Sequence, residues 1–272
     1  MHDKYVQVYK GKYFTKPKYK NVSRVIAFDL DETLGSFIDL DILWTTLNEL
    51  NHAVDFNNLL DLYPEFLRHG IISILGYLYQ KKKSGCCSKI YIYTNNQCHA
   101  DWTLMISEYF DYKLQTEEKL FDKIIYAFKI NNKQIELSRT THEKTHSDFI
   151  KCTLLPKTTE ICFIDNSEFD NMKTDRIYYI QPMSYYHNLL PSTIVDRFIN
   201  SPLGSPLKGS RDIFLKRFES VRSHRTPNPK LDVFVAHKIM YHIKEFFYLT
   251  NKRNRTKKIR FSISSSTRKK RT

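Results

Sequence analysis

The chain has 272 residues, an aromatic content of 14% and a formal net charge of +14 at pH 7. This length allows one sizeable hydrophobic core. The polar N-terminus and the lack of a long apolar run argue against a secretory signal and against a membrane-spanning helix. The five cysteines are odd in number and have no Cys-x-x-Cys spacing, which argues against a disulfide framework or a zinc site. We therefore expect an intracellular protein, either cytoplasmic or nuclear.

The positive charge lies at the two ends of the chain. Residues 1–24 contain seven Lys or Arg and one Asp, and residues 251–272 contain ten Lys or Arg and no acid. Between them the balance is slightly negative. We expect a basic N-terminal arm, which could add a β element, and a basic, serine-rich, disordered tail. Such segments are candidates for nucleic-acid binding, although they can also act only as solvated, solubilising ends.

The stretch that organises the chain is an apolar run that ends in two carboxylates. Residues 25–28 are Val-Ile-Ala-Phe, typical of a strand buried on both faces of a parallel sheet, and Asp29-Leu30-Asp31-Glu32-Thr33 follows. Because side chains alternate along a strand, Asp29 and Asp31 project to the same side and need a cation. The carboxyl ends of such strands border the ligand crevice of an open α/β sheet. The alternative is a simple strand-to-helix turn in which Asp31 or Thr33 caps a helix.

Two helical segments follow this motif. Residues 39–50 have helical apolar spacing and belong to an insert, about 35–62, that either caps the site or packs as a surface helix. Residues 64–80, which begin at Pro64, are predicted as a strongly apolar helix.

A second apolar strand, residues 89–93, ends in Thr94-Asn95-Asn96. The hydroxyl of Thr94 and the amide donors of Asn95 and Asn96 suit a phosphate, although the same residues also suit a plain turn. A helix at about 99–112 would offer its N-terminal N–H groups to the same anion, and residues 122–128 suggest a further strand.

A third apolar strand, residues 160–164, ends in Asp165-Asn166, and Asp170 follows five residues after Asp165. Lys144 precedes Asp165 by 21 residues and stands at the entrance of a helix predicted from residue 147 to about 155.

Other residues near Lys144 are candidates for similar roles. Lys151 and Lys157 are rival lysines. His142 and His146 flank Lys144, but without a third convergent ligand they do not predict a zinc site.

Together these strand ends resemble the four motifs of the haloacid dehalogenase (HAD) superfamily of phosphohydrolases. The resemblance covers roughly residues 22–190 and implies a Rossmann-like parallel sheet flanked by helices. It implies that Asp29 is a nucleophile that forms an aspartyl-phosphate, and that Asp31 protonates the leaving oxygen and later activates water.

The resemblance also implies the remaining ligands of the site. Magnesium would be held by aspartates and a neighbouring amide, namely Asp29, Asp31 through its backbone carbonyl, Asp165, and Asn166 or Asp170. The phosphate would be held by hydroxyl, amide and ammonium groups from Thr33, Thr94, Asn95 and Lys144.

The motifs resemble more than one substrate class within this superfamily. Asp29-Leu30-Asp31-Glu32-Thr33-Leu34 and Asp165-Asn166-Ser167 look like the RNA polymerase II C-terminal-domain phosphatase branch. That branch's Arg-Pro-Gly signature is absent, with Tyr63-Pro64-Glu65 at the comparable place. Thr94-Asn95-Asn96-Gln97 is closer to nucleotidases and polynucleotide phosphatases. Uncharacterised HAD-like proteins of large DNA viruses are similar overall.

Two functions follow from this resemblance. The first is a magnesium-dependent phosphatase acting on a phosphoprotein or a nucleic-acid end. The second is a HAD-fold binding module that recognises phosphoprotein or nucleic acid without turnover, a function that has no need for Asp31.

The sequence divides into four parts. We predict a basic arm at 1–24, a catalytic domain at 25–190, a helical extension at 191–250 and a disordered tail at 251–272. A short strand at 176–180 closes the catalytic domain, and the helices of the extension are predicted at 192–200, 209–221 and 231–248.

Overall fold

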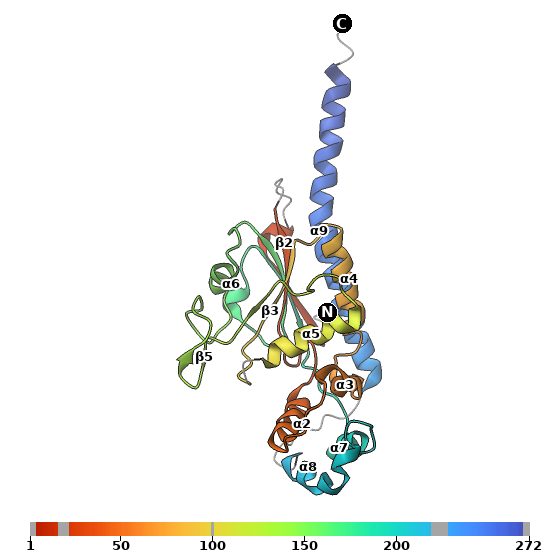
Figure 1. Ribbon diagram of the computed structural model, residues 1–272. Helices are drawn as coiled ribbons and strands as arrows, with labels where there is room; N and C mark the ends of the chain where they lie inside the picture. The colour runs from red at the N-terminus through yellow and green to blue at the C-terminus, as the bar shows by residue number, and fades with distance from the viewer. Residues whose placement is uncertain (1–3, 16–21, 99–100, 219–227, 269–272) are drawn as a thin grey trace.

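The computed structural model describes residues 4–15, 22–98, 101–218 and 228–268, and the side chains are described as far as Thr250 (Figure 1). Within these residues, no helix is both long and apolar enough to cross a membrane.

A six-stranded sheet forms the centre of the fold, in the order β1-β8-β7-β2-β3-β4. The strands are β1 (Val6–Lys10), β2 (Arg24–Phe28), β3 (Lys89–Tyr93), β4 (Lys123–Ile125), β7 (Glu160–Ile164) and β8 (Ile177–Pro182). All neighbours are parallel except β1, which pairs antiparallel with β8 at the edge. The predicted α/β fold with a mostly parallel sheet is confirmed, and the basic arm supplies the sixth strand. This arrangement is compatible with a Rossmann-like fold.

Helices cover both faces of the sheet, as predicted (Figure 1). The helices of the described residues are α1 (Lys12–Thr15), α2 (Ile38–Glu49), α3 (Phe56–Asp61), α4 (Ile71–Lys83), α5 (Trp102–Leu114), α6 (His146–Thr153), α7 (Pro191–Ile199), α8 (Arg211–Phe218) and α9 (Pro229–Arg268), and not all of them lie on the sheet. Short 3₁₀ turns are η1 (Pro64–Phe66), η2 (Asp170–Met172) and η3 (Ser205–Ser210), and a small hairpin joins β5 (Lys129–Ile130) to β6 (Lys133–Gln134).

Side-chain alternation along the strands produces two hydrophobic cores. In β2, Ile26 and Phe28 belong to the larger core with α4, α5 and α9, whereas Val25 and Ala27 belong to the smaller core with α6. Both sets are fully buried, which explains why β2 reads as a continuous apolar run in the sequence.

The helix predicted at 64–80 begins later in the structure than the sequence predicts. The chain makes the 3₁₀ turn η1, becomes extended at Leu67 and enters α4 only at Ile71, after Gly70. Gly70 has φ of +73°, a conformation that glycine adopts without the steric cost of a side chain. The break places Arg68 beside the turn that follows β2.

The insert packs as part of a helical lobe. The helix α2 contacts α8, and α7 contacts α8 as well, so that the insert and the C-terminal helices lie together beyond one end of the sheet (Figure 1). Asp39 at the start of α2 pairs with His187 at 3.1 Å, which ties the insert to the segment before α7.

The last helix runs beyond the predicted boundary at Asn251. α9 continues to Arg268, where the sequence composition predicts a disordered tail. No proline or glycine follows Pro229, and lysine and arginine have high helix propensity, so nothing in the sequence terminates the helix. The side chains of 251–268 and the whole of 269–272 lie outside the described residues.

Candidate active site

The topology brings the predicted strand ends together. From β2 the chain moves through β3 and β4 on one side, then returns to β7 and β8 on the other. The order reverses at β2, and the crevice beyond the carboxyl ends of the strands at such a point is the usual ligand site of an open α/β sheet. Asp29 follows β2, Thr94 follows β3 and Asp165 follows β7, so all three lie at this edge.

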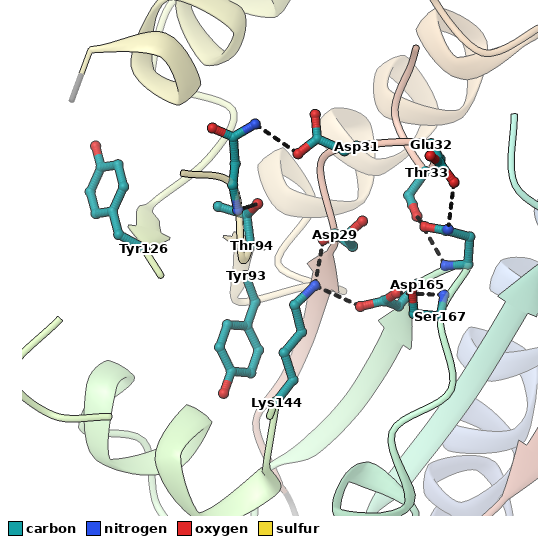
Figure 2. A network of polar contacts seen from close by, with 12 residues as sticks. Asp29, Asp31, Glu32, Thr33, Tyr93, Thr94, Tyr126, Lys144, Asp165 and Ser167 are labelled. Carbon is teal, nitrogen blue, oxygen red and sulfur yellow. Dashed lines mark hydrogen bonds and ion pairs between the residues drawn. The ribbon is translucent and has the colours of Figure 1, made fainter. Parts of the chain in front are cut away.

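Lys144 lies between two of these acids (Figure 2). Its Nζ donates to Asp165 Oδ2 at 2.7 Å and also pairs with Asp29 Oδ1. Burial alone lowers the pKa of Lys144, but the two carboxylates outweigh burial and the pKa is raised, so the ammonium is charged. The side chain of Thr145 accepts a hydrogen bond from Asp148 N and so caps the N-terminus of α6. This cap fixes the backbone next to Lys144.

Negative charge exceeds positive charge in this cluster. The carboxyls of Asp29 and Asp165 pair with the ammonium of Lys144, and the Asp31 carboxyl, which bonds Asn96, lies close enough to interact electrostatically with Lys144 and Asp29. Burial raises the pKa of Asp165, and the nearby Asp29 adds to this effect, although Lys144 acts in the opposite direction. The negative charge of the cluster therefore favours the binding of a further cation.

Asp31 is connected to the end of β3 through Asn96. Asn96 Nδ2 donates to Asp31 Oδ2 at 2.8 Å, and Asn96 N donates to Thr94 Oγ1 at 2.9 Å. Burial, followed by repulsion from Asp29, raises the pKa of Asp31 to about 6, while the hydrogen bond from Asn96 acts to lower it. From the sequence, Asn96 is expected to donate to a phosphate, whereas here its amide holds Asp31.

Thr33 and Asn166 hold two loops together. Thr33 Oγ1 donates to Asn166 Oδ1 at 2.8 Å and accepts from Asn166 N at 3.0 Å. Asn166 Nδ2 donates to Ser184 Oγ at 3.0 Å and to Glu32. Thr33 and Asn166 thus form a clamp between the turns after β2 and β7, and their predicted roles in phosphate and metal binding stay predictions.

The other predicted residues occupy different environments. Asp170 has 85% of its side chain exposed and pairs with Lys173 at 2.8 Å, so it is not drawn into the acidic cluster. Lys151 is half-exposed and lies 3.6 Å from Asp148, whereas Lys144 is buried.

The two predicted phosphate-binding residues after β3 differ in exposure. Thr94 is buried directly after β3, and Asn95 beside it is partly exposed.

Arg68 is a residue of the site that sequence reasoning missed. Its Nε donates to Thr33 O at 2.6 Å, and its Nη2 donates to Glu32 O and to Met183 O at 2.9 Å. Glu32 has a left-handed φ of 58°, which is unfavourable for a residue with a side chain. Arg68 and the N–H of Tyr185 both bond the Glu32 carbonyl and so hold this turn in place.

Replacing Arg68 by Met should therefore destabilise the fold by about 3 kcal/mol, because three carbonyls lose a charged donor. Urea unfolding followed by circular dichroism measures this change. Arg197→Met is a matched control, since Arg197 forms a partly exposed pair with Glu65 at 2.8 Å and should cost about 1 kcal/mol. Equal losses in the two variants would contradict the role assigned to Arg68.

The donor set suits a hard divalent cation with oxygen ligands. Among the described residues there is no group of three or more His, Cys, Asp or Glu side chains arranged as a metal site. The carboxylates available here are those of Asp29 and Asp165, which share Lys144. Asp29 Oδ2 has no hydrogen-bond partner among the described residues, and the excess negative charge favours a cation. Such a set fits magnesium, which keeps several water ligands of its own.

Comparison of the chain with protein-family models, with curated proteins and with solved structures finds no match.

Proposed function

We propose that this protein is a magnesium-dependent, HAD-like phosphatase that hydrolyses a phosphomonoester through an aspartyl-phosphate on Asp29. The observation that carries the proposal is the position of Asp29 at the switch point of the sheet. One carboxylate oxygen of Asp29 is held by Lys144, the other has no hydrogen-bond partner within the described part of the chain, and Asp31 lies two residues further on.

In the first step Asp29 Oδ2 attacks phosphorus and the bond between phosphorus and the leaving oxygen breaks. Asp31 gives its proton to that oxygen. A pKa of about 6 suits this role, because a measurable fraction of Asp31 is then protonated near neutral pH.

In the second step water attacks the phosphorus of the aspartyl-phosphate. Asp31, now ionised, accepts a proton from the water, and the bond between phosphorus and Asp29 breaks to release phosphate. Asn96 keeps the Asp31 carboxyl at the same place in both steps through its 2.8 Å hydrogen bond.

Asp29, Asp165 and the Asp31 carbonyl would hold the magnesium ion. When bound, magnesium neutralises the charge on the phosphoryl oxygens, so that an anionic nucleophile can approach an anionic substrate. Lys144 would supply a second positive charge, and Thr94 and Asn95, which directly follow β3, would hold the phosphate.

We infer a macromolecular substrate, either a phosphoprotein or a nucleic-acid end, from the strongly basic ends of the sequence. The binding of nucleic acid by residues 251–272 stays a prediction, because their side chains lie outside the described residues.

Hydrolysis of a generic aryl phosphate, with and without magnesium, tests the proposal. Phosphopeptides, nucleotides and oligonucleotides phosphorylated at the 3′ or 5′ end then sort the substrate classes. Tight binding of one of these phosphorylated compounds without any hydrolysis would contradict the phosphatase proposal and favour the binding module.

Metal choice gives a separate prediction. Magnesium added to metal-free protein should raise both turnover and the melting temperature, because it offsets the negative charge of the cluster. Calcium should also raise the melting temperature but support little turnover, because its larger and looser coordination shell misplaces the reacting groups. Thermal denaturation and steady-state assays measure the two effects. Activity that requires zinc instead would overturn the assignment.

A further inference from the structure

Arg139 is a buried arginine whose hydrogen bonds go to backbone carbonyls around the candidate site. Only 1% of Arg139 is exposed, in the loop between β6 and α6. Its Nη1 donates to Thr94 O at 3.0 Å and to Tyr126 O at 2.9 Å. Its Nη2 donates to His142 O at 3.0 Å and to Glu143 O at 3.4 Å.

These four carbonyls belong to three segments that meet at the site. Thr94 ends β3, Tyr126 follows β4, and His142 and Glu143 precede Lys144. The guanidinium therefore links the strand end that carries Thr94 to the loop that carries Lys144. Only the planar fork of arginine reaches all four carbonyls, because an ammonium is a single point of donation.

The Tyr93 ring lies beside both Arg139 and Lys144. The Arg139 guanidinium lies 4.9 Å from the centre of the Tyr93 ring, and Lys144 Nζ lies 5.7 Å from it. The Tyr93 hydroxyl accepts a hydrogen bond from Thr145 N at 3.2 Å. Figure 2 shows the Tyr93 ring beside Lys144, with Thr94 next to it along the chain.

The hydrogen-bond partners of Arg139 are neutral, so its positive charge is not cancelled by a bonded carboxylate. A charge that is buried beside an anion site keeps much of its electrostatic effect, because water does not screen it there. Arg139 thus has two properties that matter for a bound phosphoryl group: it fixes the backbone around the site, and it adds positive potential.

We infer that Arg139 is a positioning residue for phosphoryl transfer, which sets the placement of Thr94 and Lys144 relative to Asp29. This inference rests on the proposed function. Among the described residues, Arg139 donates to backbone carbonyls alone and to none of the proposed reacting groups, and its buried Nε has no partner. Its effect passes first through Thr94 and Lys144, and it reaches Asp29 and Asp165 only through their pairs with Lys144.

The test compares Arg139→Lys and Arg139→Ala with the unaltered protein in the presence of magnesium. Arg139→Lys keeps the charge but loses most of the four bonds, and it should lower kcat for an aryl phosphate by about 100-fold, as expected for a displacement of about 1 Å. The affinity for inorganic phosphate should fall by a larger factor than the magnesium affinity measured without phosphate, because Arg139 acts on Thr94 and Lys144 directly and on Asp29 and Asp165 only through Lys144. Isothermal titration gives both constants.

Chemical rescue separates positioning from folding. Guanidinium at millimolar, non-denaturing concentration should restore part of the kcat and of the phosphate affinity of Arg139→Ala. It should not change those of Arg197→Ala, in which the lost guanidinium pairs with Glu65 away from the cluster.

The possible outcomes separate this inference from the proposed function. Arg139 variants that are less stable, yet keep the kcat and the phosphate affinity of the unaltered protein, would leave Arg139 with a purely structural role. An unaltered protein that neither hydrolyses the aryl phosphate nor binds phosphate would remove the proposed function and this inference together.

Discussion

Asp29→Asn should lower phosphatase turnover by several orders of magnitude, because an amide cannot form the aspartyl-phosphate on which both steps depend. The substitution preserves the shape of the side chain. Lys144 keeps its 2.7 Å pair with Asp165, so the variant should remain folded. Steady-state hydrolysis of an aryl phosphate gives the loss, and acid quenching with a radiolabelled substrate detects the phosphorylated protein, which should form only with Asp29 present.

Glu32→Gln is the matched control for this substitution. Glu32 is also a carboxylate in the turn after β2, but within the described part of the chain its side chain accepts a hydrogen bond from Asn166 Nδ2 alone, at 3.3 Å, and glutamine can keep this bond. Its turnover should stay near that of the unaltered protein. Near-normal activity of Asp29→Asn would show that the reaction does not proceed through this residue.

The sequence predicted the parts of the site that depend on local pattern. An apolar run followed by an acid identifies both a buried parallel strand and the group at its carboxyl end, and parallel strand ends share one edge of a sheet. Asp29 and Asp165 could therefore be placed together from sequence. Lys144 was selected by its spacing from Asp165 at a helix entrance, and the structure places it between the two acids.

The sequence did not reveal the residues that support these groups. Arg68 and Arg139 are buried and donate hydrogen bonds to backbone carbonyls. Because every residue has a carbonyl, no particular residue type in the sequence indicates that these arginines have partners. Most arginines are exposed, which makes a surface position the natural expectation for both. Gly70, with its positive φ, lies between Arg68 and the start of α4. The spacing of apolar residues does not predict this break in the helix.

The protein contacts of three predicted ligands could not be read from the sequence for a different reason. Thr33, Asn166 and Asp170 are polar residues close in sequence to the strand-end acids, but their partners are set by tertiary contacts. Thr33 and Asn166 bond each other across two loops, and Asp170 pairs with Lys173 on the surface. Polar residues at strand ends can clamp the turns as readily as they bind a ligand.

Asp31→Asn should produce a different defect from Asp29→Asn, although the two acids are only two residues apart. The amide of this variant cannot give or take the proton, so both phosphoryl transfer and hydrolysis of the aspartyl-phosphate should slow by about 100- to 10,000-fold. Phosphate and magnesium binding should be spared, because the proposed metal ligand at Asp31 is its backbone carbonyl and not its side chain.

Beryllium fluoride separates the two defects, because it imitates a phosphoryl group attached to a carboxylate. With magnesium present, it should bind Asp31→Asn, in which the Asp29 carboxylate is intact, and fail to bind Asp29→Asn. Fluorine NMR detects the bound species directly. Binding to both variants would place the carboxylate acceptor elsewhere, while binding to neither would mean that Asp31 is needed to assemble the site. The predicted pattern arises only if Asp29 forms the covalent bond and Asp31 moves the proton.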